Sequence, residues 1–153
     1  MANGTRRRAA WIVVSVVSML GLSACAHMMT MLGGGATRPA QSEFGLGPRV
    51  TSNGLYTVTL QPVEPLAKRR LQQVRVQVLG ADRTPVDGAT ITVDGGMPQH
   101  GHGLPTRPRM TQRLGEGVYQ IDGVRFNMGG WWEFKLAIAG TAGTDSVTFN
   151  LDL

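Results

Sequence analysis

The stretch WWEFKLAIAG, residues 131–140, decides the fold. From Trp132 onward, large apolar side chains occupy every second position, and polar or small residues lie between them. A repeat of two residues is typical of a β-strand with one face in a core and the other toward solvent. The stretch therefore predicts a half-buried strand in which Trp132 faces the core and Trp131 faces outward. Exposed tryptophans are common at binding surfaces, so Trp131 is a candidate interface residue.

The same alternation recurs from Tyr56 to the end of the sequence. It predicts strands over residues 56–61, 73–78, 89–94, 110–114, 119–121, 132–138 and 147–152. About seven short strands with no helical period predict an all-β fold, an immunoglobulin-like antiparallel β-sandwich. We expect its core to contain Val76, Ile91, Tyr119, Trp132, Phe134 and Phe149.

Tyr119 follows a glycine-rich turn and opens a predicted strand. This arrangement resembles the tyrosine corner of immunoglobulin-like domains, in which the phenol bonds a backbone group a few residues upstream. An ordinary strand tyrosine is the alternative.

Residues 1–25 have the organisation of a bacterial lipoprotein signal peptide. Three arginines, at 6–8, precede an apolar run from Ala9 to Leu22, and the run ends in LSAC at 22–25. These are the parts of a secretory signal, and the run is shorter than the roughly 20 residues of a transmembrane helix. An uncleaved anchor helix is the alternative. LSAC resembles a lipobox, which predicts a lipidated Cys25 and a protein anchored to a membrane of the cell envelope, facing the periplasm or the exterior.

Residues 26–50 are rich in small and polar residues and predict a flexible tether before a domain at 51–153. The tether contains HMMTM at 27–31, which is either a methionine-rich linker or a copper-gathering arm. The chain carries 15 Lys+Arg against 10 Asp+Glu, a net charge of +5, but the three leader arginines leave +2 from Ala26 onward. The remaining basic residues are scattered, apart from the run KRR at 68–70, with no interleaved aromatics, so nucleic acid is not an expected partner.

The segment MPQHGHG, residues 97–103, brings Met97, His100 and His102 within six positions. Glycines let the backbone turn so that both imidazoles can meet one ion. The only cysteine lies in the leader, so Met110 and Met128 are the other soft candidate ligands. Thioether and imidazole ligands together favour Cu(I) over zinc. The alternatives are methionines that fill core gaps and histidines that are hydrogen-bonded within a loop crossing between the sheets.

Three segments resemble the YtkA-like/FixH-like family of small extracytoplasmic immunoglobulin-like domains. They are MPQHGHG at 97–103, GEGVYQIDGVRFNMGGWWEFKLAI at 115–138 and DSVTFNLDL at 145–153. The sequence departs from the family at Gly129, where members commonly have proline after the methionine. The resemblance implies the β-sandwich, and it implies a role in metal transport or in assembly of copper-containing oxidases, as for some members.

The sequence contains no catalytic triad order, paired-carboxylate motif or phosphate-binding loop, so we do not expect an enzyme. Two functions remain open. The first is a lipoprotein that binds or delivers copper through the His/Met residues. The second is an assembly or scaffold module that binds another envelope protein or a small ligand through the same loops without a metal.

Overall fold

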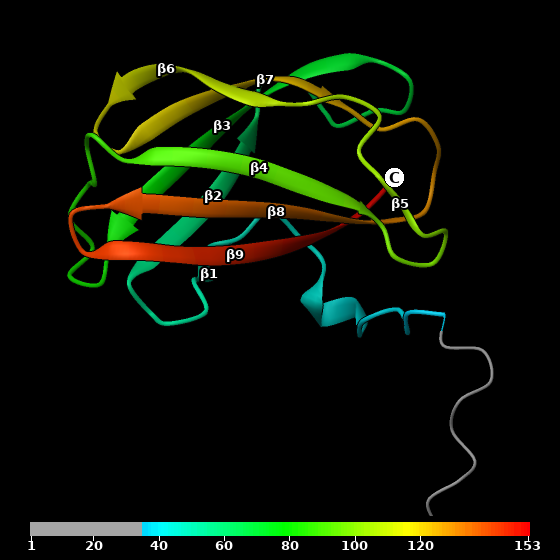
Figure 1. The fold of residues 1–153 in the computed structure, drawn as a ribbon, viewed down its shortest axis with the longest axis horizontal. Coiled ribbons are helices and arrows are strands. Elements are labelled where there is room, and N and C mark those ends of the chain that lie inside the picture. The colour runs from blue at the N-terminus through cyan, green and yellow to red at the C-terminus, as the bar shows by residue number, and fades with distance from the viewer. Residues whose placement is uncertain (1–34) are drawn as a thin grey trace, which may run out of the picture. The chain divides into compact units, whose positions relative to one another are not determined.

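Two antiparallel sheets face each other across a shared apolar core in the computed structural model, which describes residues 35–153 (Figure 1). Five strands form one sheet in the order β1–β2–β3–β7–β6: Arg49–Val50, Tyr56–Pro62, Leu71–Gly80, Val118–Arg125 and Arg109–Gly115. Four strands form the other in the order β5–β4–β8–β9: His102–Gly103, Thr90–Met97, Trp131–Gly140 and Gly143–Asp152. The predicted all-β sandwich is confirmed; β1 and β5 are short strands that the sequence pattern did not indicate. The predicted signal peptide and Cys25 lie outside the described residues.

Apolar residues face one another across neighbouring strands because the side-chain repeat is two. In the β8–β9 pair, Trp132 lies opposite Leu151 and Phe134 opposite Phe149. All six predicted core residues are buried, at 0–3% exposure. The buried apolar core lies entirely between Tyr56 and Leu151, so the unit from Gly35 to Leu153 contains a complete core.

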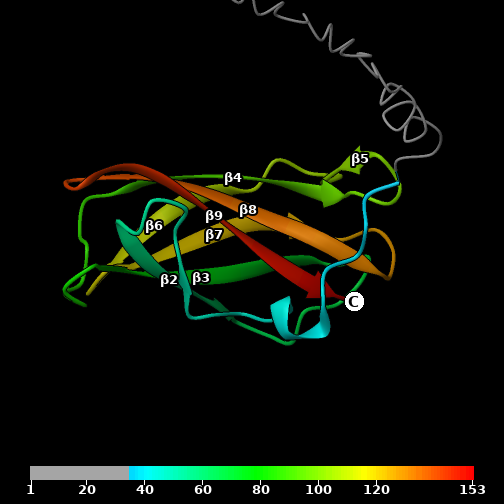
Figure 2. The same cartoon turned by 90° about the horizontal axis from the view of Figure 1, so that it is seen from below.

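The chain changes sheets between β3 and β4, between β5 and β6, and between β7 and β8, as the edge-on view in Figure 2 shows. Tyr119 of β7 stabilises the first of these crossings, the connection between β3 and β4. Its hydroxyl donates to the Val86 carbonyl and accepts from the Ala89 N–H at 2.9 Å. Both partners lie about 30 residues upstream, so the tyrosine-corner interpretation is wrong: the phenol joins two distant segments and not a local turn.

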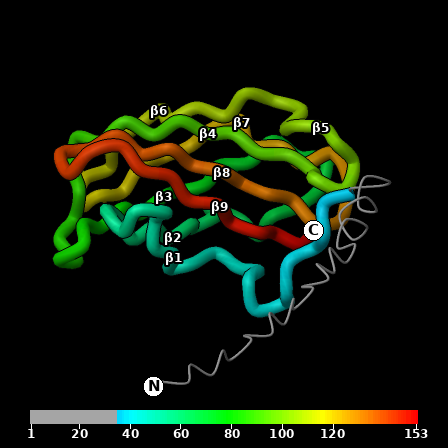
Figure 3. Tube along the Cα trace, turned by 60° about the horizontal axis from the view of Figure 1, so that its bottom comes forward, coloured from blue at the N-terminus to red at the C-terminus, as the bar shows by residue number. Residues whose placement is uncertain are grey.

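Residues 35–50 are part of this unit, which corrects the prediction of a flexible tether as far as residue 50. In Figure 3 this segment, in cyan, runs beside the end of β9. Its 3-10 helix η1, Gln41–Glu43, is followed by a hydrogen bond from Gly45 N–H to the Asn150 carbonyl at 3.0 Å. Arg38 pairs with Asp152 at 2.7 Å. The sequence signal was hidden because these contacts join residues more than 100 positions apart.

Trp131 is 3% exposed, so the prediction of an exposed interface tryptophan is wrong. Its Nε1 donates to Asn150 Oδ1 at 2.9 Å, and Asn150 Nδ2 donates to the Glu43 carbonyl at 3.3 Å. The asparagine thus ties Trp131 to the N-terminal segment. Alternation assigns a residue to one face of a sheet, but it does not say whether another segment covers that face.

A buried carboxylate holds the β1–β2 connection against β9. Asp145 is 4% exposed and accepts hydrogen bonds from the Asn53 backbone and side chain, the Leu55 N–H and the Ser146 N–H. Burial alone would raise its pKa, but these bonds and one involving Thr51 outweigh burial and lower the pKa from 3.8 to about 2. The ionised carboxylate is therefore a structural group.

Within residues 35–153 the structure contains no apolar helix of the length that a membrane span requires.

Candidate functional site

The two histidines lie on the hairpin that joins β4 to β5. The turn closes with hydrogen bonds from the N–H groups of His100 and Gly101 to the Met97 carbonyl, both at 3.0 Å. Gly101 has a φ of 66°, a conformation that glycine adopts without strain. The His100 and His102 rings stack with centroids 5.9 Å apart and an interplanar angle of 18°. Both side chains are exposed, so the structure brings the predicted pair together on an accessible surface.

The ring nitrogens of this pair are largely free of protein partners. Within the described part of the chain, the one hydrogen bond to either ring is a long contact of 3.5 Å between His102 Nδ1 and the Gly103 carbonyl. The alternative of histidines hydrogen-bonded to fix the crossing loop therefore has little support. The crossing is held instead by other residues, such as Thr106, whose hydroxyl donates to the Gly123 carbonyl at 2.7 Å.

Two glycines that the sequence reading missed set the position of the hairpin. A Cβ on Gly95 would lie 2.2 Å from the Glu133 carbonyl oxygen, and a Cβ on Gly96 would lie 2.4 Å from the His102 carbonyl oxygen. Only glycine permits backbones to approach so closely. The signal available in the sequence was the Gly-Gly pair inside an otherwise alternating strand.

His102 also contacts the core through Trp132. The two rings lie 6.0 Å apart, edge to face, and the Trp132 Nε1 donates to the Met128 carbonyl at 3.1 Å. Trp132 is fully buried, and it packs against Phe126 with ring centroids 5.2 Å apart. The hairpin histidine and the Met128 loop therefore meet on one rigid aromatic residue.

The three methionines differ in their positions. Met97 pairs with His102 across the hairpin, but it is 1% exposed and belongs to the core. This agrees with the alternative interpretation, in which the methionine fills a gap in the core. Its Cε would lie 3.1 Å from a Cβ on Gly130. Met128 is 38% exposed in the loop before β8. Met110 packs against the core from β6, in the other sheet.

Carboxylates do not complete a ligand set at this hairpin. Asp94, the nearest acidic residue in sequence, accepts a hydrogen bond from the Gly95 N–H at 2.7 Å, and Glu133 pairs with Lys135 at 2.7 Å. Within residues 35–153, no three His, Cys, Asp or Glu side chains are grouped to hold a metal. Thioethers are therefore the remaining candidate side-chain ligands beside the two imidazoles. Gly129, in the loop before β8, lies so close to the Leu153 carbonyl that a Cβ there would be 2.7 Å from its oxygen.

Comparisons with known proteins place this chain in a family. No curated protein sequence matches it. Among solved structures, the ZirS C-terminal domain is similar over 82% of this chain and 88% of its own, at 15% identity and a TM-score of 0.39. The family model described as YtkA-like matches residues 52–137, more than half of the 153 residues. The chain therefore belongs to the YtkA-like family.

Proposed function

We propose that this protein is a cell-envelope lipoprotein whose β-sandwich binds Cu(I) on the β4–β5 hairpin, for copper handling or delivery. The observation that carries the proposal is the stacked pair of His100 and His102, 5.9 Å apart, with ring nitrogens that the protein hardly uses. Two imidazoles that share one ion have ring centres roughly 5–6 Å apart, since each nitrogen lies about 2 Å from the metal. The observed centroid spacing lies in that range. Imidazole lone pairs lie in the ring planes, so the two nearly parallel rings, both exposed, would rotate to direct their nitrogens at one ion.

The surrounding residues favour a soft ion. Met128 is partly exposed, and its loop meets His102 on Trp132, so its thioether is the best candidate for a third ligand. Met97 lies beneath the hairpin and could contribute only by moving out of the core. Met110 is left out of the proposed set because it packs in the other sheet. Imidazole with thioether, and without thiolate or grouped carboxylates, suits Cu(I) better than zinc or calcium.

Titration with Cu(I) under reducing conditions, against a competing chelator, tests this site. The unit 35–153 should take up one equivalent, and the double variant His100→Ala, His102→Ala should take up none. Gln99→Ala, an exposed residue in the same turn, is the matched control and should bind as the unmodified protein does. Tryptophan fluorescence gives a second readout, because the Trp132 ring lies 6.0 Å from that of His102. Acidification should weaken binding, since protons compete for the imidazole nitrogens. Equal binding by the double variant would disprove the site.

The alternative of a metal-free scaffold acting through the same loops loses its main support, because Trp131 is buried. Binding, and not catalysis, remains the proposed role of the hairpin.

We also propose the anchor. A lipidated Cys25 would hold the domain at a membrane of the cell envelope, and several acyl chains are needed for stable anchoring. Cys25→Ser should release the protein from the membrane fraction or leave its signal uncleaved. Unchanged membrane association together with normal cleavage would contradict the lipid anchor.

A further inference from the structure

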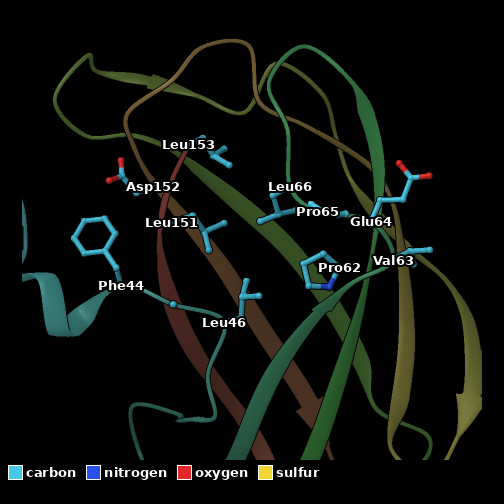
Figure 4. A pocket seen from close by; sticks show the side chains of 11 residues that line it. Phe44, Leu46, Pro62, Val63, Glu64, Pro65, Leu66, Leu151, Asp152 and Leu153 are labelled. Carbon is cyan, nitrogen blue, oxygen red and sulfur yellow. The ribbon is translucent and has the colours of Figure 1, made fainter.

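An open apolar groove of about 620 Å³ lies between the N-terminal segment, the connection after β2 and the end of β9 (Figure 4). Leu46, Leu66 and Leu151 come from these three different parts of the chain and line it. Its volume is in the range of pockets that bind ligands or short segments of other proteins. No histidine or methionine lines it, so the groove is separate from the proposed copper ligands.

Exposed apolar side chains gather at this groove. Six large hydrophobic residues of the described chain are exposed, and Leu46 and Val63 line the groove at 37% and 48% exposure. Leu71, at 68% exposure, lines an adjoining depression that shares Val63 and Glu64 with the groove. Half of the exposed large hydrophobics therefore form one surface. Such clustering marks interaction sites, whereas single exposed hydrophobics do not.

Two carboxylates flank the apolar floor. Glu64 and Asp152 are the charged residues that line the groove, and Figure 4 shows them on opposite sides of it. Each is held by an arginine outside the groove through one oxygen: Glu64 by Arg70 at 2.6 Å and Asp152 by Arg38 at 2.7 Å. Within the described residues, the second oxygen of each carboxylate accepts no hydrogen bond. Exposed ion pairs contribute little stability, so both carboxylates remain available to a ligand.

We propose that the groove docks a short apolar segment of a partner protein that carries lysine or arginine on both sides of its apolar residues. The floor supplies the apolar contact, and the flanking carboxylates select the basic residues. The lining fits the other occupants less well. Of the described residues, no lysine or arginine lines the groove to pair with the carboxylate of a fatty acid or the headgroup of an anionic lipid, and a second copy docked groove to groove would present acidic lining residues to acidic lining residues.

Two synthetic peptides test the proposal. Each has five leucine and proline residues, placed between two lysines in one peptide and between two glutamates in its twin. Titrated into isotope-labelled protein of residues 35–153, the lysine-flanked peptide should shift the NMR signals of Leu46, Val63 and Leu153. The glutamate-flanked twin should bind at least about fivefold more weakly, because charge complementarity governs the choice. Equal binding of the twins, no binding, or shifts confined to other surfaces would overturn the proposal.

Variants assign the binding to this surface. Leu46→Ser should weaken binding of the lysine-flanked peptide at least about fivefold, because apolar contact is lost. The matched control is Leu114→Ser, at an exposed leucine on β6, and it should leave binding of the peptide unchanged. The double variant Glu64→Lys, Asp152→Lys should reverse the preference between the twins. Two outcomes would overturn the proposal. Self-association in sedimentation that Leu46→Ser abolishes would assign the groove to a second copy, and displacement of the peptide by laurate would assign it to lipid. None of these outcomes depends on copper, so they are separable from the test of the hairpin.

Discussion

Tyr119→Phe removes a single buried oxygen at the crossing between the two sheets and leaves the ring in place. That oxygen makes two hydrogen bonds to the backbone of the connection between β3 and β4, at Val86 and Ala89. Tyr119 is 1% exposed and Ala89 0%, so water cannot readily replace the lost partner. The substitution therefore leaves one buried carbonyl and one buried N–H without a hydrogen-bond partner at the point where the chain changes sheets.

A buried polar group left without its partner costs about 1–3 kcal/mol, so the two together should cost about 2–6 kcal/mol of unfolding free energy. A domain of this size loses roughly 4 °C in Tm per kcal/mol, which gives a fall of about 8–24 °C. Tyr56→Phe is the matched control. Tyr56 is equally buried, but its hydroxyl makes one hydrogen bond, to the Gly143 carbonyl at 2.6 Å, in a partly accessible position. Its loss should cost about 1 kcal/mol.

Urea unfolding followed by tryptophan fluorescence, with thermal melts by circular dichroism, measures both variants. An unchanged m-value would show that the difference lies in stability and not in the compactness of the unfolded state. If Tyr119→Phe proves no more costly than Tyr56→Phe, the view that Tyr119 fastens the sheet crossing is wrong.

Three further predictions concern the core, the hairpin and a buried carboxylate. Phe134→Ala, at a position 1% exposed, should cost about 3–5 kcal/mol in urea unfolding through lost burial and a cavity; a cost near zero would contradict the register of β8. Gly96→Ala should lower Cu(I) affinity at least about tenfold by displacing His102, as loss of a supporting contact does at metal sites. Gly103→Ala is the control in the same hairpin and should leave the affinity unchanged, because a Cβ there would lie 3.5 Å from the Gly95 carbonyl oxygen, its nearest neighbour. Asp145 stabilises the fold only when ionised, and its pKa falls from 3.8 to about 2 on folding, so its contribution is complete above pH 3.8 and lost as the pH drops toward 2. Asp145→Asn should therefore flatten the pH dependence of Tm over that interval, and an unaltered slope would show that the carboxylate does not bear this role.

Local chemistry fixed much of the fold. The alternation of residues 132–138 needs no tertiary information, because a side-chain repeat of two is a property of the extended backbone. For that reason each of the seven long strands was predicted in its place, with ends up to four residues off, and all six expected core residues were predicted correctly. The pairing of His100 with His102 was also local, since two residues either side of a glycine in a hairpin turn are bound to be neighbours.

Long-range contacts decided the rest. Trp131 is buried because Asn150 ties it to a segment more than 80 positions upstream, and Tyr119 bonds a connection about 30 residues away. The groove exists only where residues near 45, 64 and 152 meet, so no single stretch of sequence carries its pattern. Periodicity records which way each side chain faces along its own strand. Which strands become neighbours, and which segment covers a face, depends on the apolar area that the assembled sheets bury together.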